Sequence, residues 1–228
     1  MKKELKIREN LSFQNMFWLF MIANVVGVIL EGVWTVFKFG RWETHVVCIL
    51  GPFNLLYGAG AILFYFISVL VQKKNPIIQF VGFAVAADIL EYIGGWMLEA
   101  GLGMKAWTYK KHFMNLQGRI SLQITIIWGA AGMIYFYLLV PRIISLFEKM
   151  KGNGWKYLCF AGTIFMIVNM TATVACLVRW SQRHYGKKAD NQIEKFIDRT
   201  YDDKRMSKLF CEWWFMDEGK EFWKEYKK

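Results

Sequence analysis

Five apolar stretches dominate this sequence, and each is long enough to cross a lipid bilayer. A hydrocarbon core about 30 Å thick is crossed by about 20 helical residues. Within hydrocarbon every backbone polar group needs an internal partner, which a helix provides. The sequence therefore predicts an all-α, polytopic integral membrane helical bundle with five transmembrane segments, or six if part of residues 103–120 re-enters the membrane. The predicted spans are Phe13–Phe37, Val46–Val71, Ile77–Leu98, Ile120–Val140 and Tyr157–Val178.

Composition and charge favour a membrane protein over the other classes. Hydrophobic residues make up 55% of the 228 residues, and the formal net charge is +11. The basic residues lie mainly in short connections and tails, where they can contact anionic lipid. No nucleic-acid motif accompanies them, so the bilayer is the predicted partner and nucleic acid is not. The four cysteines show no paired spacing, which predicts free thiols and no metal or cofactor.

Charge and hydropathy divide the chain into three parts: a basic N-terminal tail (1–12), a transmembrane bundle (13–178) and a charged tail (179–228). The positive-inside bias places the N-terminus in the cytoplasm of a multi-pass cell-membrane protein. Five spans would then put the C-terminal tail on the outer side. Apolar residues recur in this tail at i, i+3 and i+4, which predicts amphipathic helices. These helices would pack on the bundle, lie in the membrane interface or bind a partner.

Two carboxylates interrupt the third apolar stretch, and a third follows it directly. At about 100° per residue, Asp88, Glu91 and Glu99 fall on one face of a helix. A charge near the bilayer centre costs about 2.5–3.5 kcal/mol on insertion scales, so this face is predicted to turn away from lipid. The acids would serve either as polar contacts between helices or as a site for a proton, a cation or a polar substrate.

Further polar residues are predicted to join this interior. Glu31 adds a fourth carboxylate from the first span. Near the start of the second span, Asn54 shares one helical face with Gly58. Arg119, at the start of the fourth span, is a candidate counter-charge for Glu99. The aromatic-rich connection between the third and fourth spans would cover the opening of the polar cavity or lie in the interface. It supplies the remaining candidate substrate- or ion-binding residues, Trp107, Tyr109 and Asn115.

Three short motifs occur in order along the chain. They are GP…YG (Gly51, Pro52, Tyr57, Gly58), EY…LE (Glu91, Tyr92, Leu98, Glu99) and W.Y…N..GRI (Trp107, Tyr109, Asn115, Gly118, Arg119, Ile120). Over about residues 15–145 the chain thereby resembles the bacterial membrane permeases labelled ABC-transporter type IV, or CmpB-like. One departure is Thr108, where the family tends to have Asp. The resemblance implies a permease component.

These observations leave three functions to compare. The resemblance and the interior acids favour a transport component. No G-x-x-x-x-G-K-[ST] sequence occurs, so ATP-driven transport would need a separate ATP-binding subunit. A membrane scaffold, or a protein that senses lipid or a partner through its tail, is the alternative. An intramembrane enzyme is disfavoured because the three histidines lie outside the apolar cores, so no catalytic residue is predicted. A homo-oligomer stays open.

Overall fold

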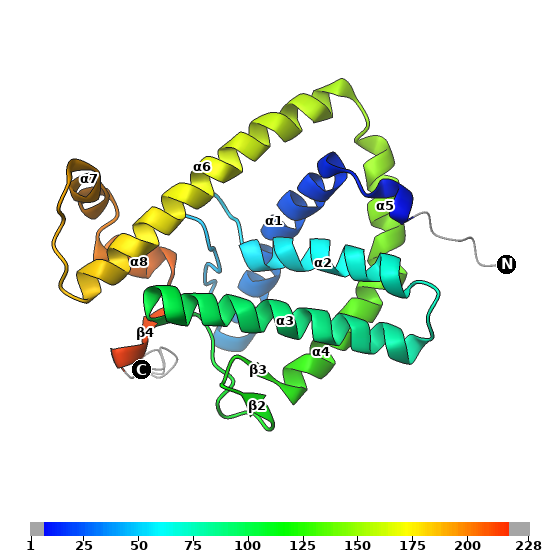
Figure 1. Ribbon diagram of the computed structural model, residues 1–228, viewed down its shortest axis with the longest axis horizontal. Coiled ribbons are helices and arrows are strands. Elements are labelled where there is room, and N and C mark those ends of the chain that lie inside the picture. The colour runs from blue at the N-terminus through cyan, green and yellow to red at the C-terminus, as the bar shows by residue number, and fades with distance from the viewer. Residues whose placement is uncertain (1–6, 219–228) are drawn as a thin grey trace. The chain divides into compact units, whose positions relative to one another are not determined.

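The computed structural model describes residues 7–218, and most of them are helical (Figure 1). This confirms the predicted all-α class. Lys2, Lys3 and Lys6 of the predicted N-terminal tail and positions 219–228 of the predicted C-terminal tail lie outside the described residues. The α-helices are α1 (Phe13–Phe39), α2 (Leu55–Val71), α3 (Pro76–Leu102), α4 (Leu122–Ile134), α5 (Val140–Lys149), α6 (Asn153–His184), α7 (Gln192–Thr200) and α8 (Asp203–Leu209).

The remaining elements are short. Within residues 7–218 each of the four strands has two residues, and they form two antiparallel pairs, β1 with β4 and β2 with β3. The segment between α3 and α4 contains three of these strands and several turns rather than a further helix. The elements are β1 (Met104–Lys105), β2 (Asn115–Leu116), β3 (Ile120–Ser121), β4 (Trp214–Phe215), and the single-turn helices η1 (Arg8–Asn10), η2 (Tyr135–Leu139) and η3 (Met216–Glu218).

Four helical segments of residues 7–218 are long and apolar enough to cross a membrane: α1, α3, the continuous α4–η2–α5 segment and α6. The predicted count of five or six spans is therefore not confirmed. The difference arises in the second predicted span, Val46–Val71, because residues 46–54 are not helical and α2 has only 17 residues. Gly51 adopts a left-handed backbone with φ of 76°, and Pro52 follows it, so helix begins only at Leu55.

The fourth span extends beyond the predicted end at Val140. Pro141 lies in the first turn of α5, and the π-helical turn η2 precedes it. Proline has no N–H to donate to the preceding turn, and a π-turn accommodates this loss inside a longer helix. The helical segment therefore continues through the proline to Lys149.

The described residues group into two compact units, which share α1, α3 and α6. The first comprises residues up to 24, 55–92 and 109–165. Its core contains Tyr65, Phe83, Phe136 and Phe147, and α2 lies beside the first half of α3 (Figure 1). The buried Tyr65 hydroxyl donates to the Ile7 carbonyl at 3.0 Å, which satisfies this polar group inside the apolar core.

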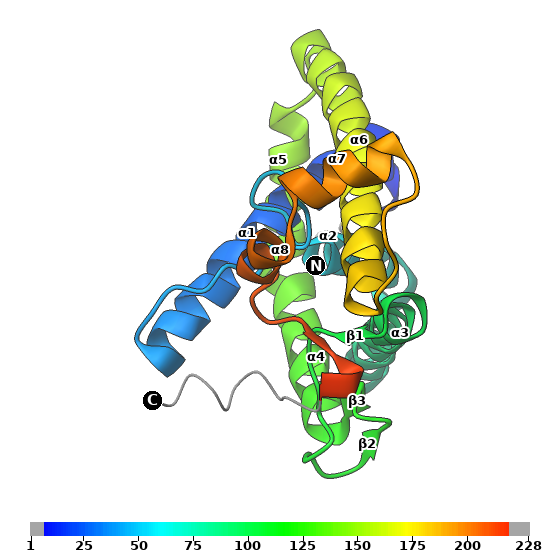
Figure 2. The same cartoon turned by 90° about the vertical axis from the view of Figure 1, so that its left-hand side faces the viewer.

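The second unit comprises residues 25–54, 93–108 and 166–218 of the described chain. Its core joins Met104 of β1, Trp180 of α6, Met206 of α8 and Phe215 of β4. Figure 2 shows α7 and α8 beside the C-terminal half of α6. Asn169 of α6 holds the backbone of Leu50 through both its amide oxygen and its amide nitrogen, so α6 supports the non-helical segment before α2.

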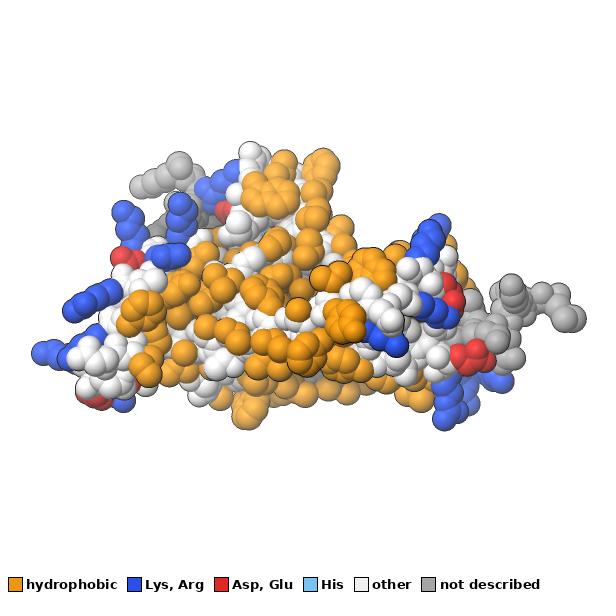
Figure 3. Space-filling view, turned by 90° about the horizontal axis from the view of Figure 1, so that it is seen from above, with side chains coloured by type: hydrophobic (Ala, Val, Ile, Leu, Met, Phe, Trp, Pro, Cys, Tyr) orange, Lys and Arg blue, Asp and Glu red, His pale blue; other side chains and the backbone are white. Residues whose placement is uncertain are grey.

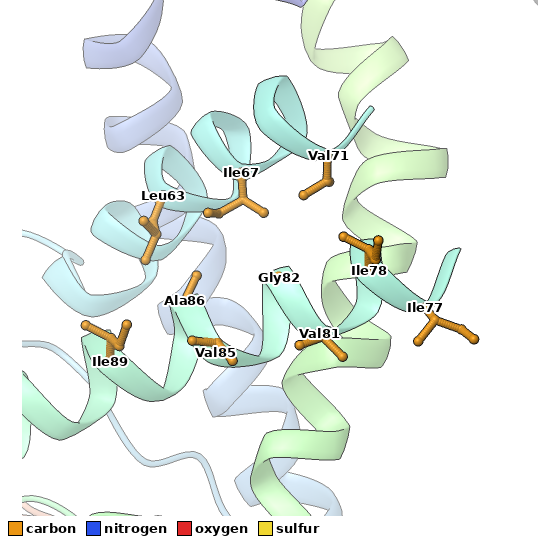
Figure 4. Close-up of a pocket in the computed structure, with 10 residues that line it drawn as sticks. All are labelled: Leu63, Ile67, Val71, Ile77, Ile78, Val81, Gly82, Val85, Ala86 and Ile89. Carbon is orange, nitrogen blue, oxygen red and sulfur yellow. The ribbon is translucent and has the colours of Figure 1, made fainter. Parts of the chain in front are cut away.

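Hydrophobic side chains also cover much of the molecular surface. On the face shown in Figure 3 they predominate, and few charged groups lie among them. An apolar groove of about 570 Å³ lies between α2 and α3, lined by residues such as Ile67, Gly82 and Val85 (Figure 4). Such a surface is unfavourable in water and favourable against lipid chains, which fits a multi-pass membrane protein.

Candidate functional site

Asp88 and Glu91 of α3 form the centre of the candidate site in the first unit. Asp88 is half-buried, and Glu91 is only 5% exposed. Ile89 and Ile93, which lie about 100° or more around the helix from both acids, are exposed. The helical period therefore separates an apolar face from a face that carries the acids, as the sequence predicts for this stretch.

Hydroxyl groups, rather than basic residues, contact these two carboxylates. The Thr125 hydroxyl of α4 donates to Oδ2 of Asp88 at 2.7 Å, and the Tyr109 hydroxyl donates to Oε1 of Glu91 at 3.3 Å. The indole Nε1 of Trp128 is a further donor beside Glu91, although it does not reach regular hydrogen-bond geometry. Each acid is thus held by a neutral donor from a neighbouring element.

The second oxygen of each carboxylate is buried and has no hydrogen-bond partner. These atoms are Oδ1 of Asp88 and Oε2 of Glu91. Within residues 7–218 neither acid forms an ion pair. A buried carboxylate oxygen without a partner is costly unless it binds a proton or a cation. Two such atoms one helical turn apart can therefore hold a positively charged species.

Asn115 organises the connection that presents Tyr109. Its side-chain oxygen accepts from the Gly118 N–H at 3.0 Å, and its amide nitrogen donates to the His112 carbonyl at 3.0 Å. Its backbone pairs with Ser121 in the β2–β3 ladder. These contacts give Asn115 a structural role in the turn, so it supports the site through Tyr109 rather than by pointing at the acids.

Arg119 lies over an aromatic ring in this unit. Its guanidinium is 4.9 Å from the centre of the Tyr92 ring and also donates to the Gln117 side chain. The Tyr92 hydroxyl donates to the same Gln117 oxygen at 2.9 Å. Cation–π contact and a shared hydrogen-bond acceptor thus hold Arg119 beside the third span.

The remaining predicted residues belong to the second unit. Glu99 forms an ion pair with Lys105 at 2.8 Å, a partner that the sequence analysis did not anticipate. The predicted pairing of Glu99 with Arg119 stays a prediction, because the two residues belong to different units. The predicted polar cavity lined by Asp88, Glu91, Glu99 and Glu31 stays a prediction for the same reason. Trp107 is half-buried in the non-helical stretch after β1.

Glu31 and Asn54 both lie close to His45, which was not among the predicted site residues. The Asn54 amide donates to the His45 carbonyl at 2.9 Å, and Nδ1 of His45 lies 3.9 Å from Glu31. Nδ1 also contacts the Glu212 carboxylate. Burial lowers the pKa of His45, but the hydrogen bond to Glu212 and the neighbouring carboxylates outweigh it, so the net pKa is raised. The spacing of 167 residues between His45 and Glu212 hides this cluster from sequence inspection.

A family model described as "Putative ABC-transporter type IV" matches residues 18–174, which includes α2 to α5, most of α1 and much of α6. No curated protein and no solved structure is significantly similar to the chain.

Proposed function

Because the chain belongs to the family described as "Putative ABC-transporter type IV", we propose that it is the membrane-embedded component of a transporter and that Asp88 and Glu91 form its proton- or cation-binding site. The chain would work with a separate ATP-binding subunit, since its sequence contains no P-loop motif. The observation that carries the proposal is the pair of carboxylate oxygens, inward-facing on α3, that lack partners.

Membrane energetics support this assignment. Acids within membrane-spanning segments are costly, and they commonly line ion pathways or proton relays. A carboxylate that only links two helices can do so through one hydrogen-bonded oxygen. A structural role therefore does not explain why the second oxygen is buried without a partner. The Asp88–Thr125 and Glu91–Tyr109 bonds leave one oxygen of each acid for a bound species. That species would exchange as the helices move during transport.

A membrane scaffold is the second candidate, and one observation favours it. Ile193 and Phe196 of α7 are 73% and 65% exposed, on a helix that also carries Lys195 and Arg199. An amphipathic helix of this kind can lie in the membrane interface or bind another protein. In this alternative the tail performs the function, and the acids of α3 only hold helices together.

The test begins with partner capture. The tagged full-length chain is purified from its native membrane in mild detergent, and co-purifying proteins are identified by mass spectrometry. We expect an ATP-hydrolysing subunit, whose activity is then measured with the chain in lipid nanodiscs. Absence of any such subunit would contradict the transport proposal and favour the scaffold.

The second arm tests the two acids. We expect Asp88→Asn and Glu91→Gln to lower ATP hydrolysis by the complex at least tenfold while the complex still assembles. Both changes preserve side-chain shape and remove charge. Glu148→Gln is the matched control, because Glu148 is exposed and pairs with Lys151 three residues away. Full activity in both α3 variants would show that the acids are structural.

A further inference from the structure

A cluster of acidic side chains surrounds His45 in the second unit, whereas Asp88 and Glu91 belong to the first unit. Glu43, His45 and Glu212 each place one ligand-type atom within 4.8 Å of the others. Glu31 of α1 adds a carboxylate 3.9 Å from Nδ1 of His45. The cluster draws on α1, the segment before α2 and the segment after α8, so it forms only when the second unit folds.

Two polar atoms of this cluster are buried and have no hydrogen-bond partner. They are Nε2 of His45 and Oε2 of Glu43. The His45 side chain is 8% exposed, and Glu43 is 9% exposed. A folded protein rarely leaves a buried ring nitrogen or a buried carboxylate oxygen without a partner. The unpartnered Glu43 oxygen, in a residue of this cluster of ligand-type atoms, therefore indicates a ligand that binds there.

The charges around the cluster define what that ligand is. Arg41 donates to Oε1 of Glu43 at 2.8 Å and offsets one of the three carboxylates of Glu31, Glu43 and Glu212. With a neutral imidazole the group then carries a net charge of about −2. A divalent cation would neutralise the cluster.

The types of ligand atom in the cluster indicate which class of divalent cation it would bind. One imidazole nitrogen with carboxylate oxygens is a ligand set that Zn²⁺ accepts, whereas Mg²⁺ and Ca²⁺ prefer oxygen alone. We propose that Glu43, His45 and Glu212 bind a Zn²⁺-type divalent ion, with Glu31 as a further oxygen donor. The ion takes the place of the proton that His45 shares with Glu212. Asn54, through its bond to the His45 carbonyl, holds the backbone of this ligand in position.

Metal titration of the purified full-length chain tests the site. After treatment with a chelator, the detergent-solubilised protein is titrated with ZnCl₂ in a calorimeter, and with CoCl₂ as a spectroscopic substitute. We expect one ion per chain and a rise in the unfolding temperature with Zn²⁺ but not with the same concentration of MgCl₂. Absence of Zn²⁺ binding would overturn the proposal and leave a protonated His45–Glu212 pair.

Substitutions locate the bound ion. His45→Gln and Glu212→Gln should each weaken Zn²⁺ binding at least tenfold. His184→Gln is the matched control, because His184 also contacts two carboxylates of this unit, those of Asp217 and Glu218, but both of these acids are exposed. Unchanged affinity in either cluster variant, or an equal loss in the control, would place the ion elsewhere and overturn the proposal.

A measurement on the unsubstituted protein keeps the test decisive if the variants do not fold. X-ray absorption at the zinc edge of the loaded protein should show a first shell of oxygen and nitrogen with an imidazole contribution. A shell dominated by sulfur would assign the ion to cysteines, and a shell without imidazole would exclude His45. Either result contradicts the proposed ligand set.

Discussion

Gly132 shows how tightly single residues are constrained in the first unit. A Cβ atom at this position of α4 would lie 2.2 Å from Cβ of Phe83 on α3, closer than any real contact. Phe83 is fully buried, so it cannot move aside easily. Gly132 therefore sets the approach of the third and fourth spans, as small residues commonly do in membrane bundles.

We predict that Gly132→Ala lowers the thermal stability of the detergent-solubilised protein. Overpacking typically costs about 1–3 kcal/mol, which exceeds the roughly 1 kcal/mol gained when alanine replaces glycine in a helix. Gly101→Ala is the control, because an added Cβ there meets no atom within 4 Å. An unfolding temperature of the Gly132 variant equal to or above that of wild type would show that the helices separate readily.

Among the secondary-structure elements, ion pairs attach α7 to the C-terminal part of α6. Asp198 of α7 accepts from Arg179 at 2.7 Å and from Arg183 at 2.5 Å. Burial raises the pKa of Asp198, but the two arginines outweigh it, so the net pKa is lowered. Arg179 is buried, so loss of the Asp198 charge would leave its guanidinium partly uncompensated.

The sign of this shift gives a pH prediction. A carboxyl whose pKa is lower in the folded state stabilises the fold above its unfolded pKa, here about 3.8, and loses this effect as pH falls through the folded value. We expect hydrogen exchange of the α7 amides to stay slow at pH 5 and to accelerate below pH 3.8, after correction for the intrinsic rate.

Asp198→Asn should expose the same amides already at pH 5, because it removes the charge at every pH. Asp190→Asn provides the control, since Asp190 is exposed and its carboxylate lies 3.9 Å from Nζ of Lys187, three residues earlier in the chain. Equal protection of α7 in wild type and the Asp198 variant at pH 5 would show that apolar packing alone attaches this helix.

For the whole molecule, the crossing of α2 decides the topology. Its 17 residues span about 26 Å at 1.5 Å per residue, close to the thickness of the hydrocarbon core. With the four longer segments this gives five crossings, so we predict that the two ends of the chain lie on opposite sides of the membrane. Terminal tags digested by protease in right-side-out and inverted vesicles would establish the sides. Two tags cleaved from the same side would show that α2 does not cross.

Much of the fold could be predicted because it depends on local sequence. Apolar length and the helical period locate four of the helices, and the same period places Asp88 and Glu91 on the face opposite Ile89. The start of the second helix could not be found in this way, because residues 46–54 are mostly apolar, yet Gly51 and Pro52 keep this stretch out of a helix. Hydropathy measures transfer into lipid, and it does not report the backbone conformation.

The sequence by itself therefore determined that the chain is an all-helical membrane protein with acids on one face of its third apolar helix. Only the tertiary structure decided which groups those acids meet, since Thr125 and Tyr109 approach them from other elements. It also brought Glu43, His45 and Glu212 together across 169 positions of the chain. The physical reason is that helix formation and burial follow from near neighbours in sequence, whereas a polar site forms from side chains that only packing makes neighbours.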